Sequence, residues 1–223
     1  MTTTINAAPI TPVPAKTPTM DWECFANDIT VASETEEQRL FQAYPTPQIT
    51  AKPGTDEWNQ QYREQRQADR TRTNKHQEFQ ARLIVAIAEA LEAEAPGFSS
   101  IIIEYQGSGD GGEEGDITID VNYIGEPTIP SERFEGYFVY SQEQKDELTR
   151  NQKFADSLLP DDLTEWLDET VWAIAYSAYP GFEINAGGFG NLTATRDEET
   201  GKMTLVLQHT QRSEETYADE VLF

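Results

Sequence analysis

The sequence has few of the residues that carry out covalent and redox chemistry. It contains one cysteine, Cys24, and two histidines, His76 and His209, among 223 residues. A single cysteine excludes a disulfide within the chain and is typical of the cytoplasm, where we expect this protein. Basic residues are also scarce, at 16 against 40 acidic ones, which argues against direct binding of nucleic-acid phosphates.

Long hydrophobic runs are missing too. No apolar stretch approaches the roughly 20 residues that cross a bilayer, and the N-terminus lacks a basic segment followed by an apolar one. We therefore expect neither membrane attachment nor a secretory signal. The apolar content of 37%, with 10% aromatic residues, still predicts a packed core.

Negative charge is concentrated in the later part of the chain. Residues 83–223 hold 29 acidic and 7 basic residues, a net charge of −22 of the −24 for the whole chain. Such a charge keeps a protein soluble and attracts positively charged partners. The oligomeric state stays open at this point.

Composition divides the chain into segments. We predict a disordered tail over residues 1–20, an irregular docking segment over 21–54 and an acidic tail over 213–223. A long helix is predicted over 55–95, with its second half packed on the body. The compact domain is predicted over 75–212.

The long helix is predicted because residues 56–95 contain no Pro or Gly, Thr55 is suited to be its N-cap, and Pro96 follows its end. In the preceding docking segment, a short helix is predicted over 34–43. The apolar stripe of the long helix comprises Phe79, Leu83, Ala86, Ile87, Ala90 and Leu91.

The compact domain alternates strand and helix patterns. Residues with a period of two indicate half-buried strands, and apolar steps of three and four indicate helices. Strands are predicted over 99–106, 116–124, 134–140, 192–196 and 203–211, and helices over 142–158 and from 161 to 178. Together these predict an α+β fold, in which an antiparallel sheet of four to five strands is covered on one face by helices.

A glycine-rich acidic segment, GSGDGGEEG, is predicted to be a loop between two strands. Its carboxylates and their neighbours form the candidate partner-binding group: Asp110, Glu113, Glu114, Asp116 and Asp120. Carboxylates on flexible backbone also suit hard divalent cations, so Asp110, Glu113 and Asp116 form a candidate metal site, to which Glu183 and Asn185 add oxygen ligands. A solvated loop is the structural alternative.

Catalytic patterns are absent. Ser108 lies outside a nucleophile elbow, and His209 falls on the apolar side of a strand, where a structural role is expected. Gly187 and Gly190, in NAGGFG, lie between a helix and a hairpin, which is the wrong context for a dinucleotide fingerprint. We therefore assign no catalytic residue and no cofactor.

Two segments together resemble a family of small bacterial domains of unknown function, often met on mobile genetic elements. The first carries Gly107, Ser108, Gly109, Asp110 and Gly112 in a strand and loop. The second, YPGFEINAGGFG, is followed by a terminal strand with His209. Its matching positions are Tyr179, Gly181, Phe182, Glu183, Asn185, Gly187 and Gly190, with Arg212 after His209. The resemblance implies one domain over residues 75–212 and transfers no activity.

Three functional hypotheses follow. The leading one is a non-enzymatic acidic protein that binds a basic protein surface; a phage or plasmid inhibitor that mimics the charge of nucleic acid fits it. The second is a divalent-metal-binding domain with hydrolytic activity. The third is a structural adaptor that uses the projecting part of the long helix, with Trp58 and Tyr62 as anchors.

Overall fold

The fold combines helices with one antiparallel sheet, as predicted. The computed structural model describes residues 17–108, 111–122, 140–180 and 187–212. In these ranges the elements are α1 (Trp22–Ala43), α2 (Asp56–Glu94), β1 (Phe98–Ser108), β2 (Gly111–Val121), α3 (Gln142–Asp156), α4 (Asp161–Ala178), β3 (Gly188–Arg196) and β4 (Met203–Gln211). The sheet order is β2-β1-β3-β4, and all neighbouring strands are antiparallel. The strand predicted over 134–140 lies outside the described residues, except for Tyr140, which precedes α3.

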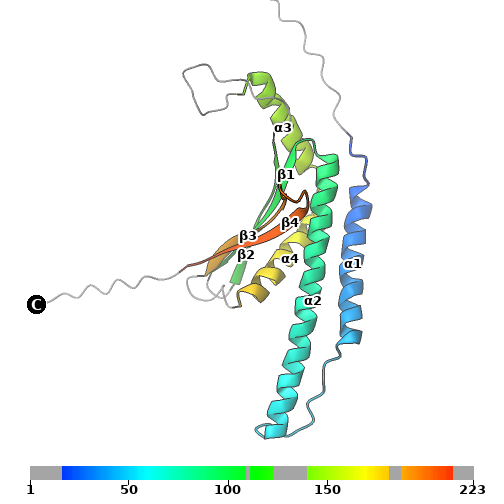
Figure 1. Cartoon of the computed structure of the whole chain (residues 1–223), viewed down its shortest axis with the longest axis vertical. Coiled ribbons are helices and arrows are strands. Elements are labelled where there is room, and N and C mark those ends of the chain that lie inside the picture. Colours follow the sequence, from blue (N-terminus) through cyan, green and yellow to red (C-terminus); the bar gives the residue numbers. More distant parts are fainter. Residues whose placement is uncertain (1–16, 109–110, 123–139, 181–186, 213–223) are drawn as a thin grey trace, which may run out of the picture.

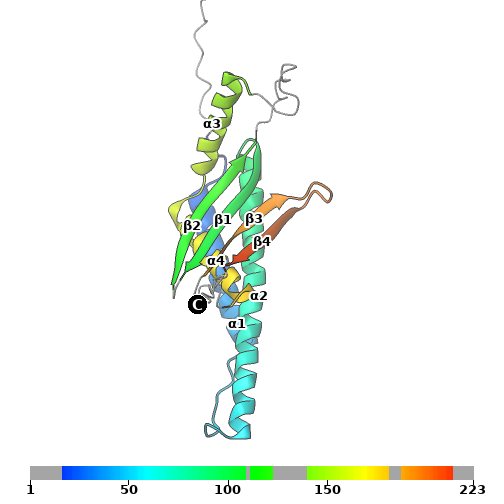
Figure 2. The same ribbon diagram turned by 90° about the vertical axis from the view of Figure 1, so that its left-hand side faces the viewer.

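The molecule has three layers. Helices α2 and α4 pack on one face of the sheet, and α1 packs on both helices from the far side (Figure 1). Figure 2 looks onto the opposite face of the sheet, with the helices behind it. We call this second face, which none of the described helices covers, the open face. The core between sheet and helices includes Ile84, Ile87, Leu91, Ile101, Ile103, Leu163, Leu167, Val171, Leu192 and Ala194.

Helix α2 follows its prediction closely. The Thr55 hydroxyl accepts a hydrogen bond from the backbone N–H of Trp58 at 3.2 Å, and the chain leaves the helix before Pro96. The buried face is rotated by about one position from the predicted stripe, because Ile84 and Ala88 are fully buried while Leu83 is only half-buried. The rotation arises because α2 contacts the sheet on one side and α1 and α4 on others.

Helix α1 corrects the prediction of an irregular segment over 21–54. It spans 22 residues instead of the ten predicted over 34–43, and Asp21 caps it by accepting from the Cys24 N–H at 3.1 Å. The end of the predicted tail over 1–20 is also placed. Thr19 donates from its backbone N–H and from its hydroxyl to the buried carboxylate of Glu94, which fixes the entry to α1 at the end of α2.

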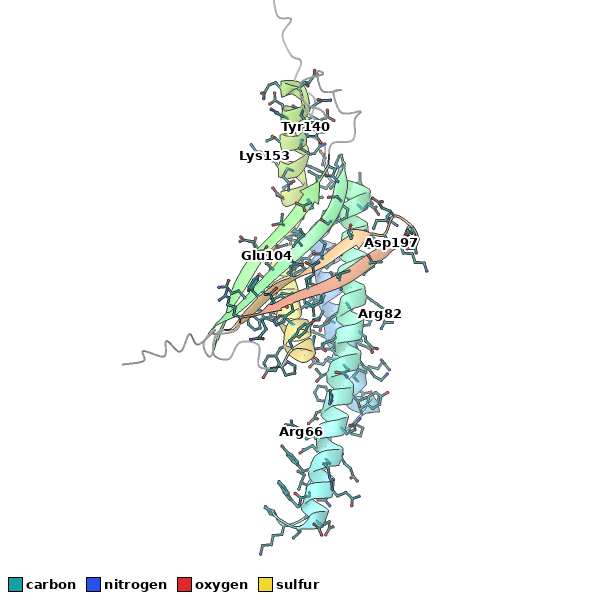
Figure 3. All side chains as sticks on the ribbon, turned by 60° about the vertical axis from the view of Figure 1, so that its left-hand side comes forward. Arg66, Arg82, Glu104, Tyr140, Lys153 and Asp197 are labelled. Carbon is teal, nitrogen blue, oxygen red and sulfur yellow. The ribbon has the colours of Figure 1, made fainter. Side chains whose placement is uncertain are left out.

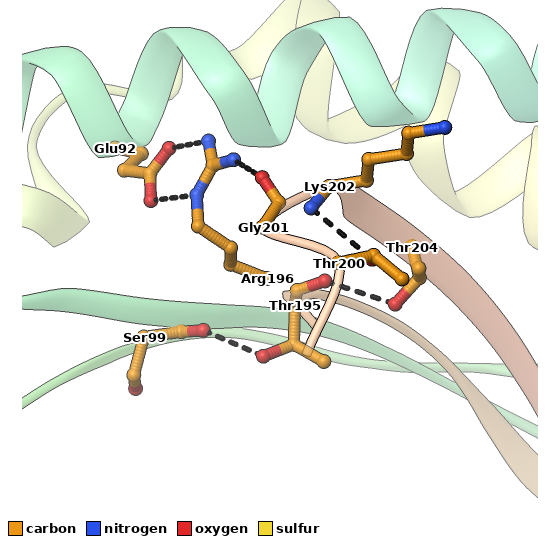
Figure 4. A network of polar contacts seen from close by, with 8 residues as sticks. All are labelled: Glu92, Ser99, Thr195, Arg196, Thr200, Gly201, Lys202 and Thr204. Atoms are coloured by element: carbon orange, nitrogen blue, oxygen red, sulfur yellow. Dashed lines mark hydrogen bonds and ion pairs between the residues drawn. The ribbon is translucent and has the colours of Figure 1, made fainter. Parts of the chain in front are cut away.

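The two β-hairpins meet through their inner strands, β1 and β3. The hairpin predicted over 192–196 and 203–211 is confirmed and begins four residues earlier. At its turn, the Arg196 guanidinium pairs with Glu92 of α2 and donates to the Gly201 carbonyl (Figure 4). The Thr195 hydroxyl donates to the Ser99 carbonyl at 2.9 Å. These contacts join the hairpin to both α2 and β1.

The predicted loop GSGDGGEEG is largely a strand ladder. Strand β1 continues to Ser108 and β2 begins at Gly111, with Gly107 opposite Gly112 and Gln106 opposite Glu113. Residues 109–110 lie outside the described residues. The prediction of a loop was wrong because glycine and acidic residues disfavour strands only weakly, and cross-strand pairing overrides that preference here.

Candidate functional site

The open face carries carboxylates that are not ion-paired. On β1, buried Ile103 and Tyr105 flank the exposed Glu104, which therefore points away from the core (Figure 3). On β2, the exposed Asp116 and the half-buried Asp120 lie on the same face. The ion pairs within the described ranges join other residues, so none neutralises these three carboxylates. The four strands carry five acidic residues and one basic residue, at the end of β3.

A β-bulge brings the first two carboxylates to the same level of the sheet. Ile103 pairs with Ile117, and Tyr105, two residues later in β1, pairs with Glu114, three residues earlier in β2. Two residues of β2, Gly115 and Asp116, therefore lie opposite the single residue Glu104. A Cβ at Gly115 would lie 2.2 Å from the Glu104 carbonyl oxygen, so only glycine allows the strands to approach this closely.

A shallow polar hollow lies around this bulge. It has a volume of about 460 Å³, and Glu104 and Asp116 supply its charge. Side-chain amides and hydroxyls complete its outward-facing lining, from Gln106, Asn191, Gln208 and Thr210. Among the described residues, the lining contains charged and neutral acceptors and no cationic side chain. Such a hollow accommodates a positively charged group that carries several N–H donors.

Apolar side chains lie on the same open face. Phe189 on β3 is 42% exposed and Val206 on β4 is 47% exposed, and Ile102 on β1 is half-buried. The guanidinium of Arg212 lies 5.2 Å from the centre of the Phe189 ring and donates to the Gln106 amide oxygen at 3.2 Å. Apolar groups beside unpaired charges are typical of the centre and rim of a protein interface.

Beneath the hollow, on the core side of the sheet, three rings stack. The ring of His209 lies 4.1 Å from that of Tyr179 and 6.0 Å from that of Tyr105. The Tyr105 hydroxyl lies 2.9 Å from His209 Nδ1 and 3.3 Å from the Gln208 carbonyl oxygen. Burial, with a smaller effect of Tyr179, raises the pKa of the Tyr105 phenol to about 12. His209 is thus held by contacts with Tyr105 and Tyr179, and its purely structural role stays a prediction.

Two glycines of β3 make room for these rings. A Cβ at Gly190 would lie 2.6 Å from the Tyr105 hydroxyl oxygen and 2.0 Å from the Gln208 carbonyl oxygen. A Cβ at Gly188 would lie 2.7 Å from His209 Cε1. Gly188 and Gly190 therefore lie in a strand under aromatic rings.

Several described residues of the family resemblance lie at one end of the sheet. Gly107 pairs with both Gly112 and Gly188, and Gly188 pairs in turn with Gln211. Next to this row, the Arg212 N–H donates to the Gly187 carbonyl at 2.9 Å. Gly190 and His209 face each other across β3 and β4. The resemblance itself stays a prediction.

Some predicted site residues are placed and others are not. Asp116 and Asp120 lie on the open face. Glu113 and Glu114 belong to β2, where their backbones pair with Gln106 and Tyr105 of β1. The remaining candidates, Asp110, Gly109, Glu183 and Asn185, lie outside the described residues. Among the described residues, no group of three or more His, Cys, Asp or Glu side chains is arranged to hold a metal ion. The metal-site hypothesis stays a prediction.

Trp58 and Tyr62 belong to the first turns of α2, the part of the helix that carries the labelled Arg66 and projects beyond the body in Figure 3. Their rings stack on each other at 5.2 Å, and Arg66 lies 5.9 Å from the centre of the Tyr62 ring. Tyr62 remains 39% exposed. The adaptor hypothesis stays a prediction.

Comparison with other proteins gives no relative from which to transfer a function. The scan against family models and the searches of curated proteins and of solved structures found no match. Within the described residues, no helix combines the length and the hydrophobicity needed to span a membrane. The function is therefore argued from the site alone.

Proposed function

We propose that this protein is a non-enzymatic interaction protein that binds a basic protein surface through the open face of its sheet. The observation that carries the proposal is the group of Glu104, Asp116 and Asp120, which lie on one exposed face without ion pairs in the described structure. A lysine or arginine of the partner enters the hollow around Glu104 and Asp116. The apolar side chains of Phe189 and Val206 supply the contact area beside it.

The chemistry of the open face favours binding over catalysis. Carboxylates, amides and a hydroxyl surround the hollow, but the nearest imidazole, His209, lies on the core side and is hydrogen-bonded to Tyr105. Separated charges on an exposed face suit recognition by electrostatic complementarity, which accelerates association and selects partners of opposite charge. The excess of negative charge across the chain acts in the same direction over longer distances.

The proposed partner is a protein whose basic surface normally contacts nucleic acid, and the protein acts as its inhibitor by occupying that surface. The three carboxylates of the open face present negative charge to the lysines and arginines that would otherwise contact a phosphate backbone. Nucleic acid should then compete with this protein for the partner. A partner that binds both at once would contradict inhibition by mimicry while leaving the basic contact intact.

The test compares two variants with the same change in charge. E104Q/D116N/D120N neutralises the open face, and E64Q/E78Q/E89Q neutralises three exposed residues of α2. Proteins captured from the native cells are purified, and their affinity is measured by calorimetry at low and moderate salt. We expect a basic partner whose affinity falls with salt and falls about tenfold in the first variant, since three surface pairs of about 0.5 kcal/mol together amount to that factor.

The α2 variant is expected to bind like the wild type. Equal loss in both variants would mean that net charge alone governs binding and would overturn the assignment to the open face. A partner that is not basic, or affinity that does not respond to salt, would contradict the proposal as a whole.

A further inference from the structure

A second cavity lies in the helical layers, away from the open face. It has a volume of about 470 Å³ and is lined by residues of α1, α2 and α4. No strand residue contributes to its lining. This cavity is therefore separate from the surface proposed to bind a basic partner, and its chemistry has to be explained on its own.

The wall contributed by α2 contains a buried amide with an unsatisfied oxygen. Gln80 is only 9% exposed, and its Nε2 donates to the Thr170 hydroxyl at 3.5 Å. Its Oε1 is buried and has no hydrogen-bond partner among the described residues. A buried acceptor without a donor destabilises the fold, whereas an apolar residue of the same size would not. Gln80 thus offers an acceptor to a molecule that enters the cavity.

A neighbouring amide adds an acceptor to the same lining. His76 Nε2 lies 3.3 Å from both the carbonyl oxygen and the hydroxyl oxygen of Ser33. Gln77 donates from its Nε2 to the Ala173 carbonyl at 2.6 Å, which leaves its own oxygen as an acceptor.

Among the described residues of the lining, the one guanidinium already has partners. Arg72 pairs with Asp69 and donates to the Tyr44 carbonyl at 2.8 Å and the Thr46 hydroxyl at 2.7 Å. It also lies 4.4 Å from the centre of the Phe41 ring. The lining is therefore rich in acceptors, and its strongest donor is already occupied. A ligand that fits this lining has to bring N–H donors.

The charged and apolar side chains of the lining indicate the remaining properties of the ligand. Glu34 and Glu37 of α1 and Glu169 of α4 line the cavity, are exposed and make no ion pair within the described structure. The electrostatic attraction of these carboxylates is screened only over a Debye length of roughly 8 Å at physiological salt. It therefore acts on a cation inside the cavity without direct contact. Apolar walls come from Leu40 and Trp166.

We propose that this cavity binds a small organic ammonium ion with an apolar body. The ammonium group donates to Gln80 Oε1, the three glutamates supply the compensating charge, and the apolar body contacts Leu40, Phe41 and Trp166. This site goes beyond the proposed function and does not depend on it.

Calorimetry on the full chain with phenethylamine, phenylacetate and 2-phenylethanol tests the charge selection, because these probes share a ring but differ in charge. We expect the amine to bind and to raise the midpoint of thermal unfolding, and the anion to have no effect. n-Butylamine and a short lysine-containing peptide serve as further arms. Binding of the peptide with an affinity above that of both free amines would contradict a small-molecule ligand, and equal binding of phenylacetate would contradict the charge assignment.

Variants identify the residues. Q80M should weaken amine binding at least tenfold, and in the absence of ligand it should raise the unfolding midpoint, because the unsatisfied amide is gone. Q38M, at an exposed position of α1, is the matched control and should change neither. E37Q/E169Q, which alters only exposed residues, should weaken binding and reduce its dependence on salt. Unchanged binding in both Q80M and E37Q/E169Q, or no binding of any amine at millimolar concentration, would overturn the proposal.

The two proposals can fail separately. E104Q/D116N/D120N, which changes the open face, should leave amine binding unchanged. Loss of amine binding in that variant would mean that the cavity does not act independently of the sheet, and would contradict the site as described.

Discussion

The two faces of the sheet are built from the same strands but have opposite properties. Towards the helices, Ile101, Ile103 and Leu192 are fully or almost fully buried. Away from them, Glu104 and Asp116 are exposed and not ion-paired in the described structure. Because side chains alternate along a strand, a shift in register by one residue would exchange the two faces. The position of the acidic face is therefore fixed by the same pairing that places the core.

The difference between the buried and the open face should have its largest effect on stability when the neighbouring isoleucines Ile102 and Ile103 of β1 are each replaced by alanine. Ile103 is completely buried, so I103A should lower the free energy of unfolding by about 2–5 kcal/mol. Ile102 lies on the open face and is half-buried, so I102A should cost clearly less. Urea denaturation of both variants measures the difference. Equal costs would mean that the open face is covered in solution.

A smaller effect is expected from adding a methyl group under the rings on the core side. In G190A the new Cβ meets the Gln208 carbonyl oxygen and the Tyr105 hydroxyl, and such overpacking costs about 1–3 kcal/mol. The neighbouring substitution N191A, on the open face, is the control and should have little effect. A G190A protein as stable as the wild type would show that the strands separate easily at this end of the sheet.

The smallest effect concerns the hydroxyl of Tyr105. Y105F removes the contacts to His209 Nδ1 and the Gln208 carbonyl, which should cost about 1 kcal/mol at neutral pH. Since burial raises the pKa of this phenol to about 12 in the folded state, its contribution is present below pH 10 and is lost as the pH rises towards 12.

The alkaline loss of stability should therefore be smaller in Y105F than in the wild type. Urea denaturation at pH 9 and pH 11.5 checks this difference, with Y62F, on the projecting part of α2, as the control. Identical pH dependence in wild type and Y105F would mean that the phenol is open to solvent.

Local patterns predicted much of the fold. The alternation over 203–211 and the lack of Pro and Gly over 56–95 depend on neighbouring residues alone, and both elements are confirmed. The second half of helix α1 was predicted over 34–43, but its first half was missed, although Trp22, Ala26 and Ile29 are buried there at steps of four and three. Their burial depends on α2 and α4, which are distant in sequence. The buried face of α2 also depends on partners that are distant in sequence.

The candidate site could be predicted only in part. The clustering of Asp116 and Asp120 near the glycine-rich segment singled them out, and alternation placed them on one face. The contribution of Phe189 depends on the pairing of β1 with β3, whose residues are almost ninety positions apart. The cavity around Gln80 forms where three helices pack together, and no local sequence pattern predicts that packing.

Helix α2 is one uninterrupted rod, about 60 Å long at 1.5 Å per residue. The buried residues of α2 begin at Gln80, in its second half, and its first turns extend past the end of α1 (Figure 1). A lateral force on those turns is therefore transmitted along the helix to the segment where Ile84 and Leu91 are packed. A molecule that binds the projecting end of α2 can act mechanically on the core of the protein.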